Sequence, residues 1–196
     1  MNLTISHYDL LIDEGNDPVH DPKPLRDYMD KWDGDVFFKN MKLDKNKCVL
    51  EIGIGTGRLA IKAAPLCKKL TGVDISPKTI QKAKCNLSSF DNINLICGDF
   101  LEMSFDEQYD VIYSSLTFMH IKDKQSAIIK VYSLLKTGGV FVLSIDKNQE
   151  KYIDYGTRKI EVYPDNKDDI IKLFDGLLHL EKISETEHAY IFTATK

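Results

Sequence analysis

The sequence lacks the features of a secreted or membrane-inserted protein. Its amino terminus, MNLTISHYDLLIDEGNDP, has no basic segment followed by an apolar stretch, and no later run approaches the length that crosses a bilayer. We therefore expect a cytoplasmic chain with no membrane partner. With 196 residues, 43% of them hydrophobic, the chain is long enough for one domain with a full core and too short for two well-developed ones.

Cysteine and positive charge are also scarce. The four cysteines, Cys48, Cys67, Cys85 and Cys97, form no CxxC pair and have no histidine nearby in the sequence, so we expect reduced structural thiols and no metal site. The net charge of −4 offers no electrostatic reason to expect nucleic-acid binding. Small-molecule partners are therefore favoured, and the sequence does not indicate an oligomeric state.

Apolar runs of strand length alternate with helical patterns, which is typical of βαβ units and a parallel sheet. We expect five central strands at 48–52, 70–74, 93–97, 109–114 and 140–145, and helices at 57–67, 78–87, 123–136 and 166–174. Thr137, Gly138 and Gly139 are expected to close the third helix. Two last runs, 178–186 and 189–195, are separated by a few polar residues and predict an antiparallel pair at one sheet edge.

The most informative segment is VLEIGIGTGRLA, residues 49–60, where a buried strand enters a glycine-rich turn and then a helix. Gly53, Gly55 and Gly57 have no side chain to keep a ligand away from the backbone. The following helix start offers unpaired N–H groups and partial positive charge. This pattern predicts a nucleotide-cofactor site.

A second signal is Asp74, which ends the next strand in the segment TGVD. A Rossmann-type site places at this position the carboxylate that accepts hydrogen bonds from a ribose diol. The less specific interpretation is a solvated aspartate at a strand end, but the spacing from the glycine turn favours the ribose role.

The glycine turn by itself leaves the cofactor open, because GTGRLA also satisfies the loose GxGxxA form used for NAD. Glu51, two residues before the first glycine, separates the two possibilities. A carboxylate at the end of a buried strand suits a positively charged cofactor and repels a pyrophosphate. S-adenosylmethionine carries a sulfonium and an ammonium and has no phosphate.

Further ordered segments accompany the glycine turn. They are GVDISP, CGDF, YDVIYSSLTFMHI and LLKTGGVFVLSI, followed by the two carboxyl-terminal runs. In this order the chain resembles class I S-adenosylmethionine-dependent methyltransferases over about 150 residues from Cys48. Thr137 departs from the pattern, since a proline is usual there.

The resemblance implies an α/β fold: a Rossmann-like three-layer αβα sandwich around a mostly parallel seven-stranded sheet with a C-terminal antiparallel hairpin strand. Residues 1–40, irregular in pattern, would form a cap or lid, and residues 41–196 the S-adenosylmethionine-binding domain. The first segment is either a short helical cap over the sheet or a mobile lid. Residues 147–164 resist assignment and would contribute acceptor contacts.

The resemblance also implies a set of cofactor contacts. Glu51 and the glycine turn would face the methionine moiety. Asp99 and Phe100 would contact the adenine. Ser114 and Ser115 would line the methyl-bearing side of the cofactor. The full set is Tyr8, Glu51, Gly53, Gly55, Thr56, Gly57, Asp74, Ile75, Asp99, Phe100, Ser114 and Ser115.

Methyl transfer from a sulfonium mainly requires alignment and exclusion of water, so a general base is needed only for acceptors that must lose a proton. The candidates for such a base are His120, His20 and Asp146. A surface histidine or a helix-capping aspartate is the less specific interpretation of each.

We therefore expect an enzyme that methylates a small molecule, with the acceptor unidentified. The alternatives are a module that holds S-adenosylmethionine without catalysis, and an NAD-dependent oxidoreductase. A filled space beside the methyl group would favour the non-catalytic module.

Overall fold

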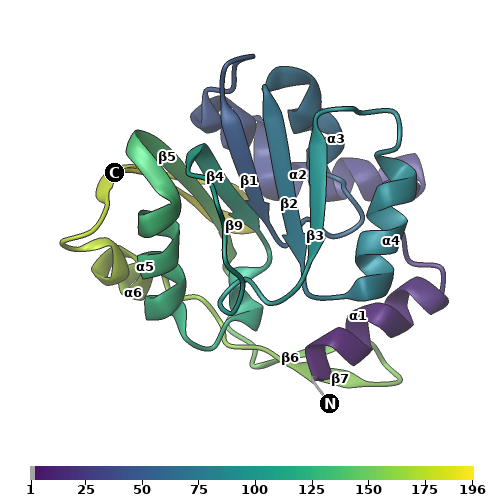
Figure 1. The fold of residues 1–196 in the computed structure, drawn as a ribbon. Coiled ribbons are helices and arrows are strands. Elements are labelled where there is room, and N and C mark those ends of the chain that lie inside the picture. The colour runs from purple at the N-terminus through teal and green to yellow at the C-terminus, as the bar shows by residue number, and fades with distance from the viewer. Residues whose placement is uncertain (1–2) are drawn as a thin grey trace.

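The computed structural model describes residues 3–196, which form one seven-stranded sheet with helices on both faces (Figure 1). The strands are β1 (Cys48–Ile52), β2 (Lys69–Asp74), β3 (Ile93–Cys97), β4 (Tyr109–Ser115), β5 (Leu135–Asp146), β8 (His179–Glu185) and β9 (Ala189–Thr195). Their order across the sheet is β3-β2-β1-β4-β5-β9-β8. The expected α/β sandwich with a mostly parallel sheet of seven strands is confirmed.

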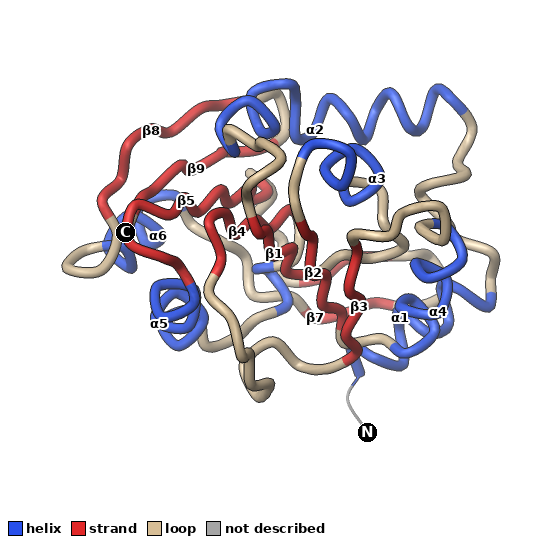
Figure 2. Tube along the Cα trace, turned by 45° about the horizontal axis from the view of Figure 1, so that its top comes forward, coloured by secondary structure: helices blue, strands red, loops and turns tan. Residues whose placement is uncertain are grey.

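All the described helices except the first divide between the two faces of the sheet, as the tube view also shows (Figure 2). The helices are α1 (Leu3–Asp13), α2 (Lys23–Met41), α3 (Ala60–Ala63), α4 (Pro77–Asn86), α5 (Lys124–Leu134) and α6 (Lys167–Phe174). One hydrophobic core joins the sheet to α5 and α6, and a second joins it to α2, α3 and α4. The central strands are nearly continuous apolar runs because both of their faces are covered.

The carboxyl-terminal pair forms as expected from the sequence. Strand β9 runs antiparallel to β5, with Leu143 opposite Phe192, and β8 pairs antiparallel with β9 at the sheet edge. Phe192 is fully buried and its ring lies 6.0 Å from that of Phe174 in α6. The hairpin therefore completes the core on the side of α5 and α6.

Two expectations about local structure are wrong. The helix expected over 57–67 is reduced to α3 and a 3-10 turn, Ala64–Leu66, because Pro65 has no N–H to continue an α-helix. Thr137, Gly138 and Gly139 do not close α5: they belong to β5, which begins directly after the helix at Leu135. Tertiary pairing decides this, since Leu135 already lies opposite Tyr109 of β4.

The first 40 residues are more regular than their sequence pattern indicates, because they contain α1 and most of α2; residues 1 and 2 of the expected cap lie outside the described residues. Inside α2, Gly34 has φ of +67°, and the helix is kinked there. Phe37 and Met41, after the kink, are fully buried. The unassigned interval 147–164 contains a small antiparallel pair, β6 (Tyr152–Asp154) and β7 (Lys159–Glu161).

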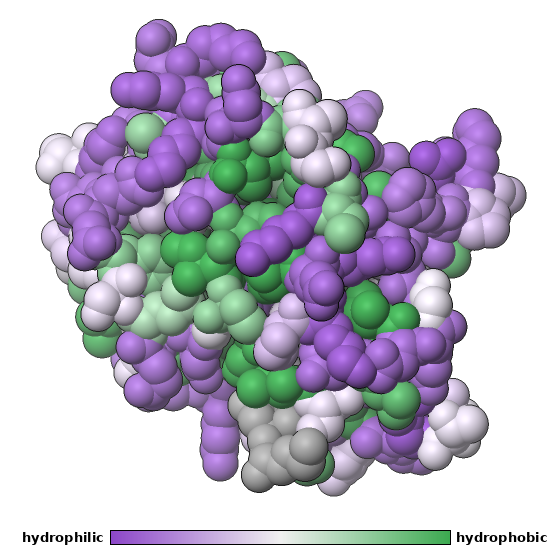
Figure 3. Space-filling model, turned by 45° about the vertical axis from the view of Figure 1, so that its right-hand side comes forward, coloured by the Kyte–Doolittle hydropathy of each residue, from purple (hydrophilic) through white to green (hydrophobic). Residues whose placement is uncertain are grey.

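Residues 98–108 connect β3 to β4 without a helix. Partly buried hydrophobic side chains of this connection and of β3, including Ile96, Met103 and Phe105, pack against the core on the α5 side. Figure 3, which brings the right-hand side of the molecule forward, shows hydrophobic residues gathered in the middle of that face between hydrophilic margins. No helix within residues 3–196 is long and apolar enough to cross a membrane.

Candidate active site

The glycine turn between β1 and α3 is held against β2. The N–H groups of Gly53 and Ile54 both donate to the carbonyl of Val73, at 2.9 and 3.0 Å. Gly53, Gly55 and Gly57 all have positive φ, which favours glycine at each position. A Cβ on Gly55 would meet open space, whereas one on Gly53 would overlap the side chain of Thr117. The turn is therefore tight on the β4 side and open at its centre.

Asp74 lies at the end of β2, beside this turn. Its carboxylate accepts hydrogen bonds from the N–H of Gly55 at 3.0 Å and of Ser76 at 3.0 Å. Burial raises the pKa of the Asp74 carboxyl, while these hydrogen bonds act in the opposite direction. Two backbone donors leave acceptor sites on the carboxylate for a ligand, because its two oxygens offer about four.

Glu51, at the end of β1, is a buried carboxylate with 2% exposure. The hydroxyl of Tyr113 on the neighbouring strand donates to Glu51 Oε2 at 2.6 Å. Burial raises the pKa of Glu51 to about 8 despite this hydrogen bond. Tyr113 was not identified from the sequence, although it stands directly opposite Glu51 in the register of β1 and β4.

The serines that follow on β4 have different roles. Ser114 is fully buried and donates to the carbonyl of Ile52 at 2.9 Å, so it joins the ends of β4 and β1. Ser115 donates to Asp33 Oδ1, a residue of α2. The structure thus brings Ser115 together with a segment 82 positions earlier in the chain.

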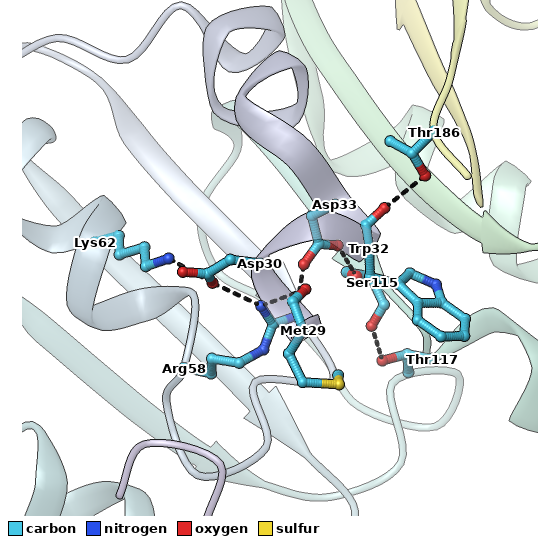
Figure 4. Close-up of polar contacts among 9 residues, drawn as sticks. All are labelled: Met29, Asp30, Trp32, Asp33, Arg58, Lys62, Ser115, Thr117 and Thr186. Atoms are coloured by element: carbon cyan, nitrogen blue, oxygen red, sulfur yellow. Dashed lines mark hydrogen bonds and ion pairs between the residues drawn. The ribbon is translucent and has the colours of Figure 1, made fainter. Parts of the chain in front are cut away.

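Asp33 joins three parts of the site (Figure 4). Asp33 is 2% exposed. Its Oδ2 accepts a hydrogen bond, at 2.6 Å, from Nη2 of Arg58, the residue that directly follows the glycine turn. Arg58 also lies 3.5 Å from Asp30. The carbonyl of Trp32, next to Asp33, accepts from Thr186 Oγ1 at 2.9 Å, which anchors the kinked helix to the β8–β9 hairpin. No sequence pattern distinguishes Asp33 from the other acidic residues of its segment.

Helix α1 also contacts the site, at the end of the sheet where β2 and β4 terminate. The Tyr8 hydroxyl lies 2.6 Å from Nε2 of His120, in the loop after β4. Burial raises the pKa of Tyr8 and lowers that of His120 to about 4, so both are neutral at neutral pH. Asp9 accepts from the Ser76 hydroxyl at 2.6 Å, which ties α1 to the start of α4. Tyr8, His120 and Asp74 thus lie at one end of the sheet.

The other predicted contacts are placed as follows. Thr56 is buried, and its Oγ1 has no hydrogen-bond partner within residues 3–196. Ile75 is half-buried, and Asp99 is exposed with its carboxylate accepting from the N–H of Leu101. Phe100 is 6% exposed and packs in the core, its ring 6.0 Å from that of Phe105.

The three candidate bases lie in different surroundings. His120 contacts Tyr8, and its Nδ1 is buried without a partner among the described residues. His20 is exposed, and its Nε2 lies 3.2 Å from Oδ1 of Asn86. The side-chain nitrogen of Asn86 donates to the carbonyl of Thr56. Asp146, the last residue of β5, lines a cavity of about 370 Å³ next to Met119. The structure does not bring the three together.

Comparisons with known proteins agree with this arrangement. The family model described as a methyltransferase domain matches residues 43–174. The chain is 41% identical over 101 residues to the malonyl-[acyl-carrier protein] O-methyltransferase of Priestia megaterium, covering 49% of this chain and only 35% of that relative. The chain thus spans about a third of the length of this curated relative.

Solved structures share the fold. The N-methyltransferase NodS from Bradyrhizobium japonicum, solved with S-adenosyl-L-homocysteine, superposes with a TM-score of 0.71 at 18% identity, covering 98% of each chain. The [4+2]-cyclase SpnF superposes with a TM-score of 0.78 at 14% identity, covering 98% of this chain and 95% of that one. At these identities the likeness concerns the fold. The family match over residues 43–174 shows that the chain belongs to the methyltransferase domain family.

Proposed function

We propose that this chain is an S-adenosylmethionine-dependent methyltransferase that acts on a small-molecule acceptor. The observation that carries the proposal is the pair of carboxylates, Glu51 and Asp74, at the ends of adjacent strands on either side of the glycine turn. Ligands of doubly wound α/β folds bind at this end of the strands.

The residues present fit S-adenosylmethionine better than a dinucleotide. Glu51 accepts a hydrogen bond from the neutral Tyr113 hydroxyl, and burial raises its pKa although Arg58 acts in the opposite direction. A bound ammonium or sulfonium would attract the Glu51 carboxylate, whereas a pyrophosphate would repel it. The unpartnered Thr56 Oγ1 and the open space at Gly55 leave room for polar contact along the turn.

The cofactor would supply a methyl group on an activated sulfonium carbon, so the protein has to hold and orient the reactants and exclude water. Asp74 would accept from the ribose hydroxyls and Glu51 would neutralise the methionine end. Tyr8 and His120, joined across the site, would close it from the side of α1. The cavity beside Asp146 provides space for an acceptor, which supports an enzyme over a non-catalytic binding module.

Calorimetric titration tests the cofactor. S-adenosylmethionine and S-adenosylhomocysteine are expected to bind and NAD is not. Asp74→Ala is expected to weaken binding of S-adenosylhomocysteine by roughly 1–3 kcal/mol, the range for losing hydrogen bonds to a charged group.

The matched control is Asp91→Ala, which removes an exposed aspartate before β3, at the opposite end of the sheet. It is expected to leave the affinity unchanged. Tight binding of NAD with neither adenosyl compound would overturn the cofactor assignment, and an unchanged affinity in Asp74→Ala would show that the ribose is placed wrongly.

A further inference from the structure

A cavity of about 370 Å³ lies at the end of the sheet where the cofactor residues stand. Its walls come from the end of β5, from β6 and from the segment before α6, and include Asp146, Tyr152 and Asp165. Met119 also lines it and is the chain neighbour of His120. Because the strands β1, β4 and β5 are parallel, the cavity at the end of β5 lies at the same end of the sheet as the proposed methyl-transfer site.

The polar lining of this cavity is strongly acidic. Four carboxylates, from Asp146, Glu150, Asp154 and Asp165, line it, and no lysine, arginine or histidine of the described chain does. Asp154 forms an ion pair, at 3.0 Å, with Lys159, which does not line the cavity. Asp146 and Glu150 have no ion-pair partner within residues 3–196. The cavity therefore has uncompensated negative charge.

A second observation concerns Asp165, which lines the cavity although its side chain is only 3% exposed. Lys124 lies 2.8 Å from its Oδ1. That ammonium is shared with three backbone carbonyls, including those of Phe118 and Tyr163. Although that ammonium is close, the buried Oδ1 accepts no well-aligned hydrogen bond from the described residues, so this carboxylate is not fully satisfied by the protein.

The pKa shifts of two of these carboxyl groups agree with a site that takes a cationic ligand. Burial raises the pKa of both Asp146 and Asp165 above the ordinary range, although Lys124 acts against this at Asp165. A cationic ligand would favour the charged form of each. The remaining lining is apolar, with Met119, Ile153 and Val162 among it, and suits a hydrophobic body attached to the charge.

We propose that the acceptor is an amine on a small apolar body, which enters this cavity as a cation and is methylated at nitrogen. This rests on the proposed methyltransferase function. A carboxylate acceptor, such as the malonyl group in the name of the Priestia relative, would be repelled by the same lining.

The proposed methylation of the amine takes place in two steps. The ammonium of the acceptor gives one proton to the Asp146 carboxylate, which leaves a lone pair on nitrogen. That lone pair forms a bond to the methyl carbon, and the electrons of the broken carbon–sulfur bond pass to sulfur, which becomes a neutral thioether. The product leaves as a methylated ammonium, and Asp146 returns its proton to water.

Three probes of matched shape test the charge preference: 2-phenylethylamine, 3-phenylpropanoate and 2-phenylethanol. Each is titrated calorimetrically at neutral pH into the protein saturated with S-adenosylhomocysteine. We expect the amine to bind roughly ten-fold or more tightly than the other two, the gain of one good charge-assisted contact.

The double variant Asp146→Asn/Glu150→Gln removes the unpaired charges and is expected to weaken amine binding roughly ten-fold. Asp91→Asn/Asp175→Asn is the matched control: it removes two exposed carboxylates that belong to loops at the opposite end of the sheet. This control is expected to bind the amine as the wild type does. Binding of S-adenosylhomocysteine by both double variants shows that each is folded.

The outcomes separate the two proposals. Failure of the wild type to bind S-adenosylhomocysteine overturns the methyltransferase proposal. If that compound binds, the amine proposal is overturned by any of three results: no heat from millimolar amine, equal or tighter binding of the carboxylate, or unchanged amine affinity in Asp146→Asn/Glu150→Gln.

Discussion

At the scale of single residues, the surroundings of Glu51 are the most unusual feature of the site. An acidic side chain at the end of a buried strand would ordinarily be paired with a cation, but its hydrogen-bond partner here is the hydroxyl of Tyr113. The protein without ligand thus carries a carboxyl group that burial keeps protonated up to about pH 8. Such an arrangement costs stability and suits a cationic ligand.

This predicts a pH dependence of stability. Burial raises the pKa of Glu51 from 4.5, its value in the unfolded chain, to about 8 in the folded protein. The protonated carboxyl therefore contributes its full stabilisation below the unfolded-state pKa. That contribution is lost as pH rises through the folded-state pKa. Between these limits the free energy of unfolding should fall by up to about 1.4 kcal/mol per pH unit relative to Glu51→Gln, which cannot ionise. Urea unfolding of both proteins without ligand at about pH 5, 7 and 9 measures the difference. Equal pH profiles would contradict the raised pKa.

At the scale of elements, the two amino-terminal helices differ in how they attach. Helix α1 has one buried residue, His7, and is held mainly by polar contacts. They include the hydrogen bonds of Tyr8 and Asp9 and the exposed ion pair of Lys78 with Asp13 at 2.5 Å. Helix α2 contributes the fully buried Phe37 to the core. We therefore propose that the boundary between cap and domain lies before α2 and not at residue 40, as the sequence pattern indicates.

Two truncations test this boundary. Removal of residues 1–15 is expected to lower the free energy of unfolding by only roughly 1–3 kcal/mol, because exposed ion pairs and a few hydrogen bonds are lost. It should weaken S-adenosylhomocysteine binding, since Tyr8 is removed. Removal of residues 1–40 should abolish cooperative unfolding, which chemical denaturation followed by circular dichroism would detect. Equal stability of the two truncated chains would contradict the proposed boundary.

At the scale of the whole molecule, the sheet separates two hydrophobic cores, and the strand β9 takes part in both. Ile191 belongs to the core on the side of α2, and Phe192 to the core on the side of α5 and α6. Alternation along the strand sends these neighbours to opposite faces. The carboxyl-terminal hairpin is therefore part of one cooperative unit.

Phe192→Ala is expected to lower the free energy of unfolding by roughly 3–5 kcal/mol, because it leaves a cavity beside Phe174. Unfolding should remain a single transition with coincident fluorescence and circular dichroism signals. The control Ile129→Ala, at a side chain 49% exposed on α5, should change stability by less than about 1 kcal/mol. Two separate transitions in Phe192→Ala would show that the hairpin unfolds independently.

Local sequence patterns were enough to predict most of the sheet and the end of it that carries the site. Continuous apolar runs and the glycine turn are local signals, and the structure has strands β1 to β4 and helix α4 within one or two residues of the predicted positions. Glu51 and Asp74 could be placed beside the turn because the ends of adjacent parallel strands meet at one edge.

The features that depend on distant segments follow from tertiary packing and could not be predicted from the sequence. The start of β5 at Leu135, where a helix end was expected, follows from pairing with Tyr109. The contacts of Asp33 with Arg58 and Ser115 join residues far apart in the chain, and the acidic cavity gathers carboxylates from β5, β6 and the segment before α6. Such contacts leave no local periodicity, because each depends on the packing of elements whose separation along the chain carries no pattern.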